Sequence, residues 1–185
     1  PLTACRAGRA HATQYDAGCT AYQLPTKETL EDVQMVCMAM PWMSGCSVRS
    51  RCSSRAALAG DAFCAPFALL KMLCDDMPGM MGCQNNYVRM CNTSSVVAQC
   101  AIEVPPLPMS MMLSGMLSRL CADRAANPGC QTFAACPTPL GMSQCDLLGA
   151  YSAVCAANGI GEQESDCSMW RMSCQAFNAT GNAMD

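Results

Sequence analysis

The chain has 185 residues, with 17 cysteines and 17 methionines but a single histidine, and its net charge is −3. The few basic residues are scattered, which excludes the basic surface typical of nucleic-acid-binding proteins. No stretch has the roughly 18 to 20 uninterrupted apolar residues of a membrane-spanning helix. Cysteine above about 8 per cent is typical of a disulfide scaffold made in an oxidising compartment, and it predicts a secreted or cell-surface protein.

Four segments taken in chain order have apolar residues at helical spacing and lead up to a cysteine. They are residues 26–37, 61–74, 110–121 and 143–155. In the first, Leu30 and Val33 are expected to face inward, and in the second we expect Asp61 to cap a helix with Pro66 in its first turn. In the last, Ser143 and Asp146 occupy capping-box positions. Because strand-like alternation is absent, the sequence predicts an all-α protein.

The cysteines repeat as a unit. A C-x8-C-x5/7-C pattern occurs at Cys37, Cys74 and Cys121, with a looser copy at Cys155, and each copy follows one further cysteine. The spacing before each copy alternates between long and short, which indicates that a two-module unit is duplicated. We therefore expect four disulfide-rich helix-loop-helix modules in two units, 19–91 and 92–174, between an N-terminal tail 1–18 and a C-terminal tail 175–185. Cys5 is left over.

Helix geometry restricts the disulfides. Residues ten apart on one helix are separated by roughly 15 Å, too far for Cys64 and Cys74 to pair. In an antiparallel helix pair the simplest arrangement is nested, first cysteine with fourth and second with third. The nested pairs are Cys19–Cys52, Cys37–Cys46, Cys64–Cys91, Cys74–Cys83, Cys100–Cys136, Cys121–Cys130, Cys145–Cys174 and Cys155–Cys167. Interlaced and cross-module pairings stay open, since four cysteines allow three connectivities.

Two of the modules place methionines inside the loop between the second and third cysteines. The loop "CMAMPWMSGC" holds Met40 and Met43, and "CDDMPGMMGC" holds Met77 and Met80. Thioether sulfur is a soft ligand that favours Cu(I) and is available where thiols are oxidised. We expect these four methionines to bind Cu(I), with secondary ligands at Met38, Met81, Met169 and Met172. Methionine also fills irregular cores, and Met72, Met112, Met116 and Met142 are assigned to that role.

The spacing C-x2-M-x2-M-x2-C-x5-C at Cys37, Met40, Met43, Cys46 and Cys52 resembles the Cys-Met motif of green-algal proteins. These are the extracellular regions of Ctr-type copper transporters and their soluble relatives. The resemblance implies a role in copper acquisition outside the cell, with a membrane copper transporter as partner. The copy beginning at Cys74 differs in a longer final spacing, and the third module has Arg124 and Asn127 at the positions of the methionines.

No set of residues typical of catalysis is present, because the only histidine, His11, lies near the chain end. We therefore expect a protein that is not an enzyme. Two sequons predict N-glycosylation at Asn92 and Asn178. Glycosylation agrees with a location outside the cell, as a secreted protein, at the extracellular face of the plasma membrane or in the cell wall. The alternative to a copper-binding module is a structural wall, matrix or filament protein. Tandem disulfide modules and the left-over Cys5 are compatible with such a protein, assembled as a homo-oligomer or a matrix.

Overall fold

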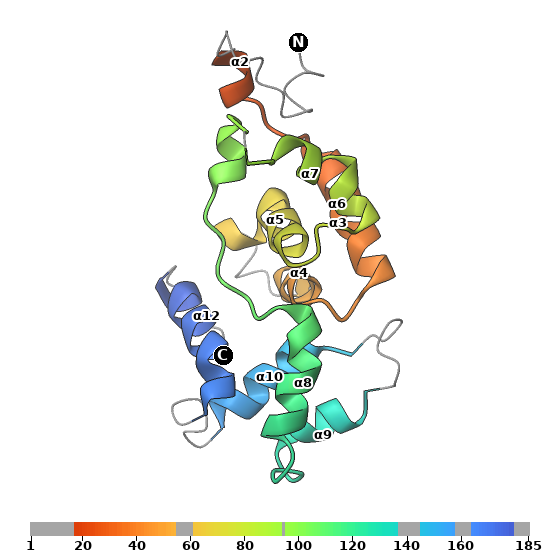
Figure 1. The fold of residues 1–185 in the computed structure, drawn as a ribbon, viewed down its shortest axis with the longest axis vertical. Helices are drawn as coiled ribbons and strands as arrows, with labels where there is room; N and C mark the ends of the chain where they lie inside the picture. The colour runs from red at the N-terminus through yellow and green to blue at the C-terminus, as the bar shows by residue number, and fades with distance from the viewer. Residues whose placement is uncertain (1–16, 55–60, 94, 137–144, 158–163, 180–185) are drawn as a thin grey trace.

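The computed structural model describes residues 17–54, 61–93, 95–136, 145–157 and 164–179 (Figure 1). In these ranges the chain is helical or irregular, without a strand, so the all-α prediction is confirmed. The α-helices are α2 (Ala17–Thr20), α3 (Thr26–Ala39), α4 (Ser44–Ser54), α5 (Pro66–Asp76), α6 (Met81–Asn85), α7 (Tyr87–Met90), α8 (Ser110–Leu120), α9 (Pro128–Ala134), α10 (Leu147–Ala156) and α12 (Ser168–Ala179). Short 3₁₀ turns are η2 (Ala62–Cys64), η3 (Ala98–Ala101) and η5 (Ser165–Cys167).

All four predicted helical segments form helices, with two corrections. Asp61 does not cap α5, because the helix begins at Pro66. Proline disfavours helical backbone in the preceding residue, and Ala65 is accordingly extended, with φ −58° and ψ 139°. Leu30 is 44 % exposed, since α3 turns its Val33 and Val36 side towards the core. Asp146 caps α10 as predicted, accepting a hydrogen bond from the Gly149 amide, while Ser143 lies outside the described residues.

The two helices of a module do not pack mainly against each other. Helix α3 packs on α5 and α6, and α4 packs on α5, so each second helix rests on the first helix of the other module in its unit. Glycines allow this close approach: Gly45 of α4 lies against Leu73 of α5, and Gly82 of α6 lies against Asp32 and Val36 of α3. The upper half of Figure 1 shows α5 surrounded by these helices.

The second unit keeps this exchange for α9, which packs on α10, but not for α12, which also packs on α10, the first helix of its own module. Gly129 of α9 packs against Ala150 and Val154 of α10, as the glycines of the first unit do. In the fourth module the residue before the third cysteine is Asp166 instead of glycine. Its carboxylate reaches the Arg119 guanidinium on α8, the first helix of the third module. An ion pair therefore takes the place of a close backbone contact.

Seven disulfides join pairs of described cysteines. Each of the seven links a cysteine to the next cysteine along the chain. The pairs are Cys37–Cys46, Cys52–Cys64, Cys74–Cys83, Cys91–Cys100, Cys121–Cys130, Cys136–Cys145 and Cys155–Cys167. The four predicted inner pairs are confirmed.

The four predicted outer pairs are wrong: Cys19–Cys52, Cys64–Cys91, Cys100–Cys136 and Cys145–Cys174. The nested prediction assumed that each module closes on itself. Because the second helix leaves its own module to pack on the neighbouring one, its last cysteine meets the cysteine that precedes the next module. Cys19 is disulfide-bonded, Cys174 is a free thiol, and Cys5 lies outside the described residues.

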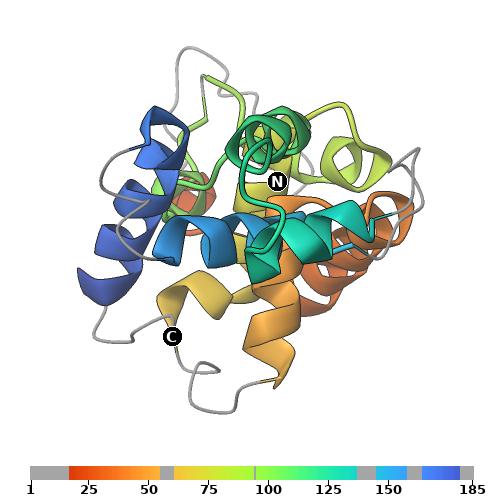
Figure 2. The same cartoon turned by 90° about the horizontal axis from the view of Figure 1, so that it is seen from below.

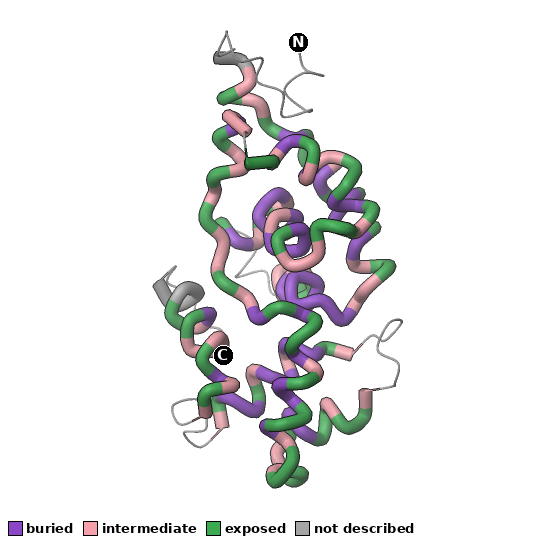
Figure 3. The backbone as a smooth tube through the Cα atoms, viewed as in Figure 1, coloured by how far each residue is buried: buried purple, intermediate pink, exposed green. Residues whose placement is uncertain are grey.

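The two units meet where α4 faces α8 and α10, and the view from below in Figure 2 shows α10 crossing this junction. Ser44 donates its amide to Ser110 Oγ at 2.8 Å, and Asp76 accepts from the same Ser110 amide and hydroxyl. Ser47 Oγ donates to Asp146 Oδ1 at 2.6 Å. The buried residues form one continuous core through both units (Figure 3), and Cys91–Cys100 crosses the predicted boundary between residues 91 and 92.

In the described part of the chain no helix combines the length and the apolar character needed to cross a membrane.

Candidate metal-binding surface

The two methionine loops have the same backbone. In each, the first methionine donates its amide to the end of the preceding helix, Met40 to Val36 and Met77 to Leu73. The methionine three residues later donates back to the first, Met43 to Met40 and Met80 to Met77, both at 3.2 Å. The inner disulfide then closes the turn. The sequence similarity of the two loops therefore extends to their conformation.

The third module makes the second of these turns without methionine. Asn127 donates its amide to Arg124 at 2.9 Å, as Met43 does to Met40, whereas Arg124 donates to Cys121 because α8 already ends at Leu120. The Asn127 side chain also caps α9, by accepting from the Gly129 amide at 2.8 Å. Because Arg124 and Asn127 support this turn, the turn itself does not need methionine. The methionines of the other two loops must be explained by packing or by their sulfur.

The structure separates the predicted copper ligands by burial. Met43 is 0 % exposed and belongs to the core, so its sulfur is not accessible from solvent. The side chains of Met40, Met77 and Met80 are half-buried against the core. Of the secondary candidates, Met38, Met81 and Met172 are exposed and Met169 is half-buried. The pair Met40–Met43 therefore offers one accessible thioether, and the pair Met77–Met80 offers two partly accessible ones.

The exposed apolar residues of the described chain are mostly methionine. Seven of the eight large hydrophobic side chains that are exposed have a thioether, and Leu30 is the other one. The seven are Met35, Met38, Met81, Met109, Met111, Met112 and Met172. Core filling does not account for side chains that stand in water. Met72 and Met116 are buried, as the core-filling assignment predicts, whereas Met112 is 55 % exposed and Met142 lies outside the described residues.

Methionine also occupies helix N-caps, where it cannot serve the helix. Met80 precedes α6 and Met109 precedes α8, and neither side chain makes a capping hydrogen bond. Asparagine and aspartate at these positions stabilise a helix by about 1 kcal/mol relative to residues without a capping group. The chain uses such residues elsewhere, at Asn127 and Asp146. Helices α6 and α8 are therefore less stable with methionine at the N-cap than they would be with asparagine or aspartate there.

Sequence reasoning missed a second group of methionines, between α8 and the start of α12. Met109, Met112 and Met116 are spaced three and four apart on and just before α8, and Met169 of α12 lies on the opposite side. The four line one groove with a volume of about 340 Å³. The spacing was the available signal, because residues at i, i+3 and i+7 share one helix face. The partner on α12 could not be found from the sequence pattern.

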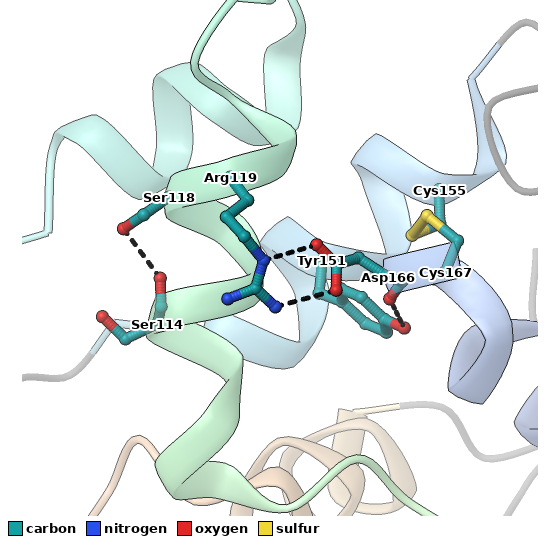
Figure 4. A network of polar contacts seen from close by, with 7 residues as sticks. All are labelled: Ser114, Ser118, Arg119, Tyr151, Cys155, Asp166 and Cys167. Atoms are coloured by element: carbon teal, nitrogen blue, oxygen red, sulfur yellow. Dashed lines mark hydrogen bonds and ion pairs between the residues drawn. A yellow bond between two sulfur atoms is a disulfide. The ribbon is translucent and has the colours of Figure 1, made fainter. Parts of the chain in front are cut away.

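Arg119 and Asp166, which both line this groove, form an ion pair (Figure 4). Arg119 donates two hydrogen bonds of 2.8 Å to the Asp166 carboxylate, from Nε and Nη2. The Tyr151 hydroxyl donates to the Asp166 carbonyl at 2.7 Å, and the Cys155–Cys167 disulfide ties the next residue to α10. The hydrogen bonds from Arg119 lower the pKa of Asp166, and burial raises the pKa of Tyr151. The ion pair, the Tyr151 hydrogen bond and the disulfide together hold η5 beside α8.

This ion pair predicts a loss of stability in acid. Since the pKa of Asp166 is lower in the folded chain than in the unfolded one, its contribution is complete above the unfolded value of about 3.9. The contribution disappears as the pH falls through the lower folded value. We expect wild type to lose more of its free energy of unfolding between pH 5 and pH 2 than Asp166→Asn, as measured by urea denaturation at each pH. Equal losses in the two proteins would contradict the ion pair.

Ligands other than methionine are few. No cluster of three or more histidine, cysteine, aspartate or glutamate side chains that could hold a metal ion occurs among the described residues. The free thiol Cys174 is half-buried, and burial raises its pKa, so it is protonated at neutral pH. Asn92 is exposed, as a glycosylation site requires, while Asn178 is in α12 with its side chain outside the described set.

Comparisons with known proteins add one relative. The chain is similar to Protein P80 of Dictyostelium discoideum, with 33% identity over 162 residues. The similarity covers 86% of this chain but 28% of P80, so the chain spans a little over a quarter of that relative's length. No family model matches the chain. No solved structure is similar to it either.

Proposed function

We propose that this chain is an extracellular Cu(I)-binding module that captures copper for uptake, with methionine thioethers as its ligands. The observation that carries the proposal is the exposure of methionine. Among the described residues, nearly all exposed large apolar side chains have sulfur, including Met38, Met81 and Met109. Leucine would give the same apolar surface, so the repeated use of methionine favours a role for the sulfur atom.

The disulfides support this choice of ligand. A chain with this many disulfides belongs in an oxidising compartment, where thiols are consumed. Thioethers persist there, and they select Cu(I) over zinc and over the oxygen-binding cations. In this proposal the module sits outside the cell, as a secreted protein or at the cell surface, and passes copper to a membrane copper transporter. The resemblance of the Cys37 and Cys74 loops to the Cys-Met motif supports the same role.

The proposal predicts Cu(I) binding that does not depend on pH. Histidine, thiolate and carboxylate ligands lose affinity as they are protonated, whereas a thioether has no proton to gain in this range. We expect the purified protein, with its disulfides intact, to compete with a chromogenic Cu(I) chelator for at least one Cu(I). Its affinity should change less than threefold between pH 7 and pH 5, and Zn(II) should not displace the copper.

Two results would contradict the proposal. A tenfold or larger loss of affinity at pH 5 would indicate imidazole or thiolate ligands, for which His11 and Cys174 are available. Absence of Cu(I) binding at both pH values would favour the alternative, a structural wall, matrix or filament protein that uses its disulfides for toughness. Replacement of Met40, Met77 and Met80 by leucine tests the predicted loops, because leucine preserves volume and apolarity.

A further inference from the structure

We infer that the groove between α8 and the start of α12 is the tightest Cu(I) site of this chain, with Met109, Met112, Met116 and Met169 as its ligands. This inference rests on the proposed function and assigns it to residues outside the predicted loops. The groove has a volume of about 340 Å³ and is open to solvent along the exposed Met109 and Met112. It brings together four thioethers. The Cys37–Cys46 loop has two that are at least partly accessible, Met38 and Met40, and the Cys74–Cys83 loop has three, Met77, Met80 and Met81.

The ligands come from opposite sides of the groove. Met109, Met112 and Met116 form one stripe along α8, with Met116 only 7 % exposed at its inner end and Met109 and Met112 more than half exposed. Met169 stands across from them in the first turn of α12. Methionine has three rotatable side-chain bonds, so four such side chains can turn their sulfur atoms towards one ion. Soft sulfur ligands without a thiolate favour Cu(I).

The walls of the groove are held in place by contacts that do not involve the methionines. The Arg119–Asp166 pair joins α8 to η5, as Figure 4 shows. Outside the groove, Ser173 Oγ of α12 donates to the Pro106 carbonyl at 2.5 Å, in the segment that leads into Met109. A site whose walls are already fixed loses less conformational entropy when it binds its ligand.

The charge of the groove also suits a monovalent ion. Arg119 and Asp166 are the charged side chains that line it, and they neutralise each other in a two-fold hydrogen-bonded pair. Zn²⁺ is bound in proteins by thiolate, imidazole and carboxylate groups, and Ca²⁺ by oxygen ligands that usually include carboxylates. The groove has no cysteine or histidine, and its one carboxylate, Asp166, is paired with Arg119. Neutral thioethers can hold Cu(I), or the chemically similar Ag(I), without a compensating carboxylate.

The stability cost at Met109 points the same way. This residue is the N-cap of α8, has no capping hydrogen bond and is 54 % exposed. Asparagine at this position would be expected to stabilise the helix by about 1 kcal/mol. Neither core packing nor helix capping explains methionine here, whereas a ligand role does. Met112, inside α8, is 55 % exposed, so core packing does not explain that methionine either.

The test compares leucine substitutions at matched numbers of methionines. The groove variant is Met109→Leu and Met112→Leu; the control is Met35→Leu and Met111→Leu, and all four side chains are exposed. Ag(I) is titrated first, as a redox-stable probe, and Cu(I) is then competed against a chromogenic chelator. We expect the groove variant to lose at least tenfold in affinity for the first ion bound, and the control to change less than twofold.

A second measurement locates the ion directly. With the methionine methyl groups labelled with ¹³C, the first equivalent of Ag(I) should shift the signals of the four groove methionines before any others. First shifts at Met40, Met77 and Met80, or a tight site lost from the loop variant but kept in the groove variant, would overturn this inference and leave the proposed function standing. Equal metal affinity in wild type and in all variants would also overturn this inference. It would indicate that the groove serves another purpose, such as docking another protein. Absence of Ag(I) and Cu(I) binding in wild type would overturn both proposals.

Discussion

Gly82→Ala should lower the free energy of unfolding by about 1–3 kcal/mol, the usual cost of forcing an extra methyl group into a packed interface. That methyl group would lie 2.5 Å from the carbonyl oxygen of Asp32 and 2.8 Å from Val36 Cγ2. Helices α3 and α6 would have to separate. Separation would also weaken the hydrogen bonds of 2.9 and 2.8 Å that Asn85 and Asn86 donate to the buried Asp32 carboxylate.

The control for this substitution is Gly79→Ala, three residues earlier in the loop. Gly79 has no atom within 4 Å of the position of an added methyl group, and its φ lies outside the left-handed region. Alanine there is expected to leave stability unchanged or to raise it slightly, because it restricts the unfolded chain. Chemical denaturation of both variants measures the difference. Equal stabilities would show that α6 does not pack closely on α3 and would contradict the exchange of helices between modules.

Replacement of Cys74 and Cys83 together by alanine should cost about 3–5 kcal/mol. Their disulfide closes a loop with a sequence separation of 9, and the lost restriction of the unfolded chain accounts for about 2–4 kcal/mol. The remainder comes from burial, since Cys74 is 1 % and Cys83 0 % exposed and removal of their sulfur atoms leaves a cavity. Urea denaturation of the variant, with the other disulfides intact, gives the total.

Cys91 and Cys100 provide the matched pair. Their disulfide has the same sequence separation of 9, but both residues are half-buried. The same double replacement by alanine should therefore cost the loop-closure part alone, about 1 kcal/mol less than the loss at Cys74 and Cys83. If both variants lose the same amount, burial of the sulfur adds nothing. If neither loses stability, the disulfides do not act through the unfolded chain.

Much of the local structure follows from the sequence alone. Apolar residues at helical spacing predicted the helices that form α8 and α10, and Asp146 was recognised as a helix cap. The inner pairs Cys37–Cys46 and Cys74–Cys83 were also predictable, because the chain reverses between two helices within the eight residues that separate these cysteines. These features depend on residues near each other in sequence, and short-range geometry determines them.

Tertiary packing decided the outer disulfides and the accessibility of the methionines. Nothing local distinguishes Cys52–Cys64 from Cys19–Cys52, since the difference arises from which module α4 packs against. Met43 and Met80 occupy equivalent positions in similar loops, yet Met43 is wholly buried and Met80 is half-buried. The groove pairs Met169 with methionines more than fifty residues earlier. Such contacts form only when separate helices are placed side by side, because burial and proximity are properties of the packed chain and a repeated motif does not specify them.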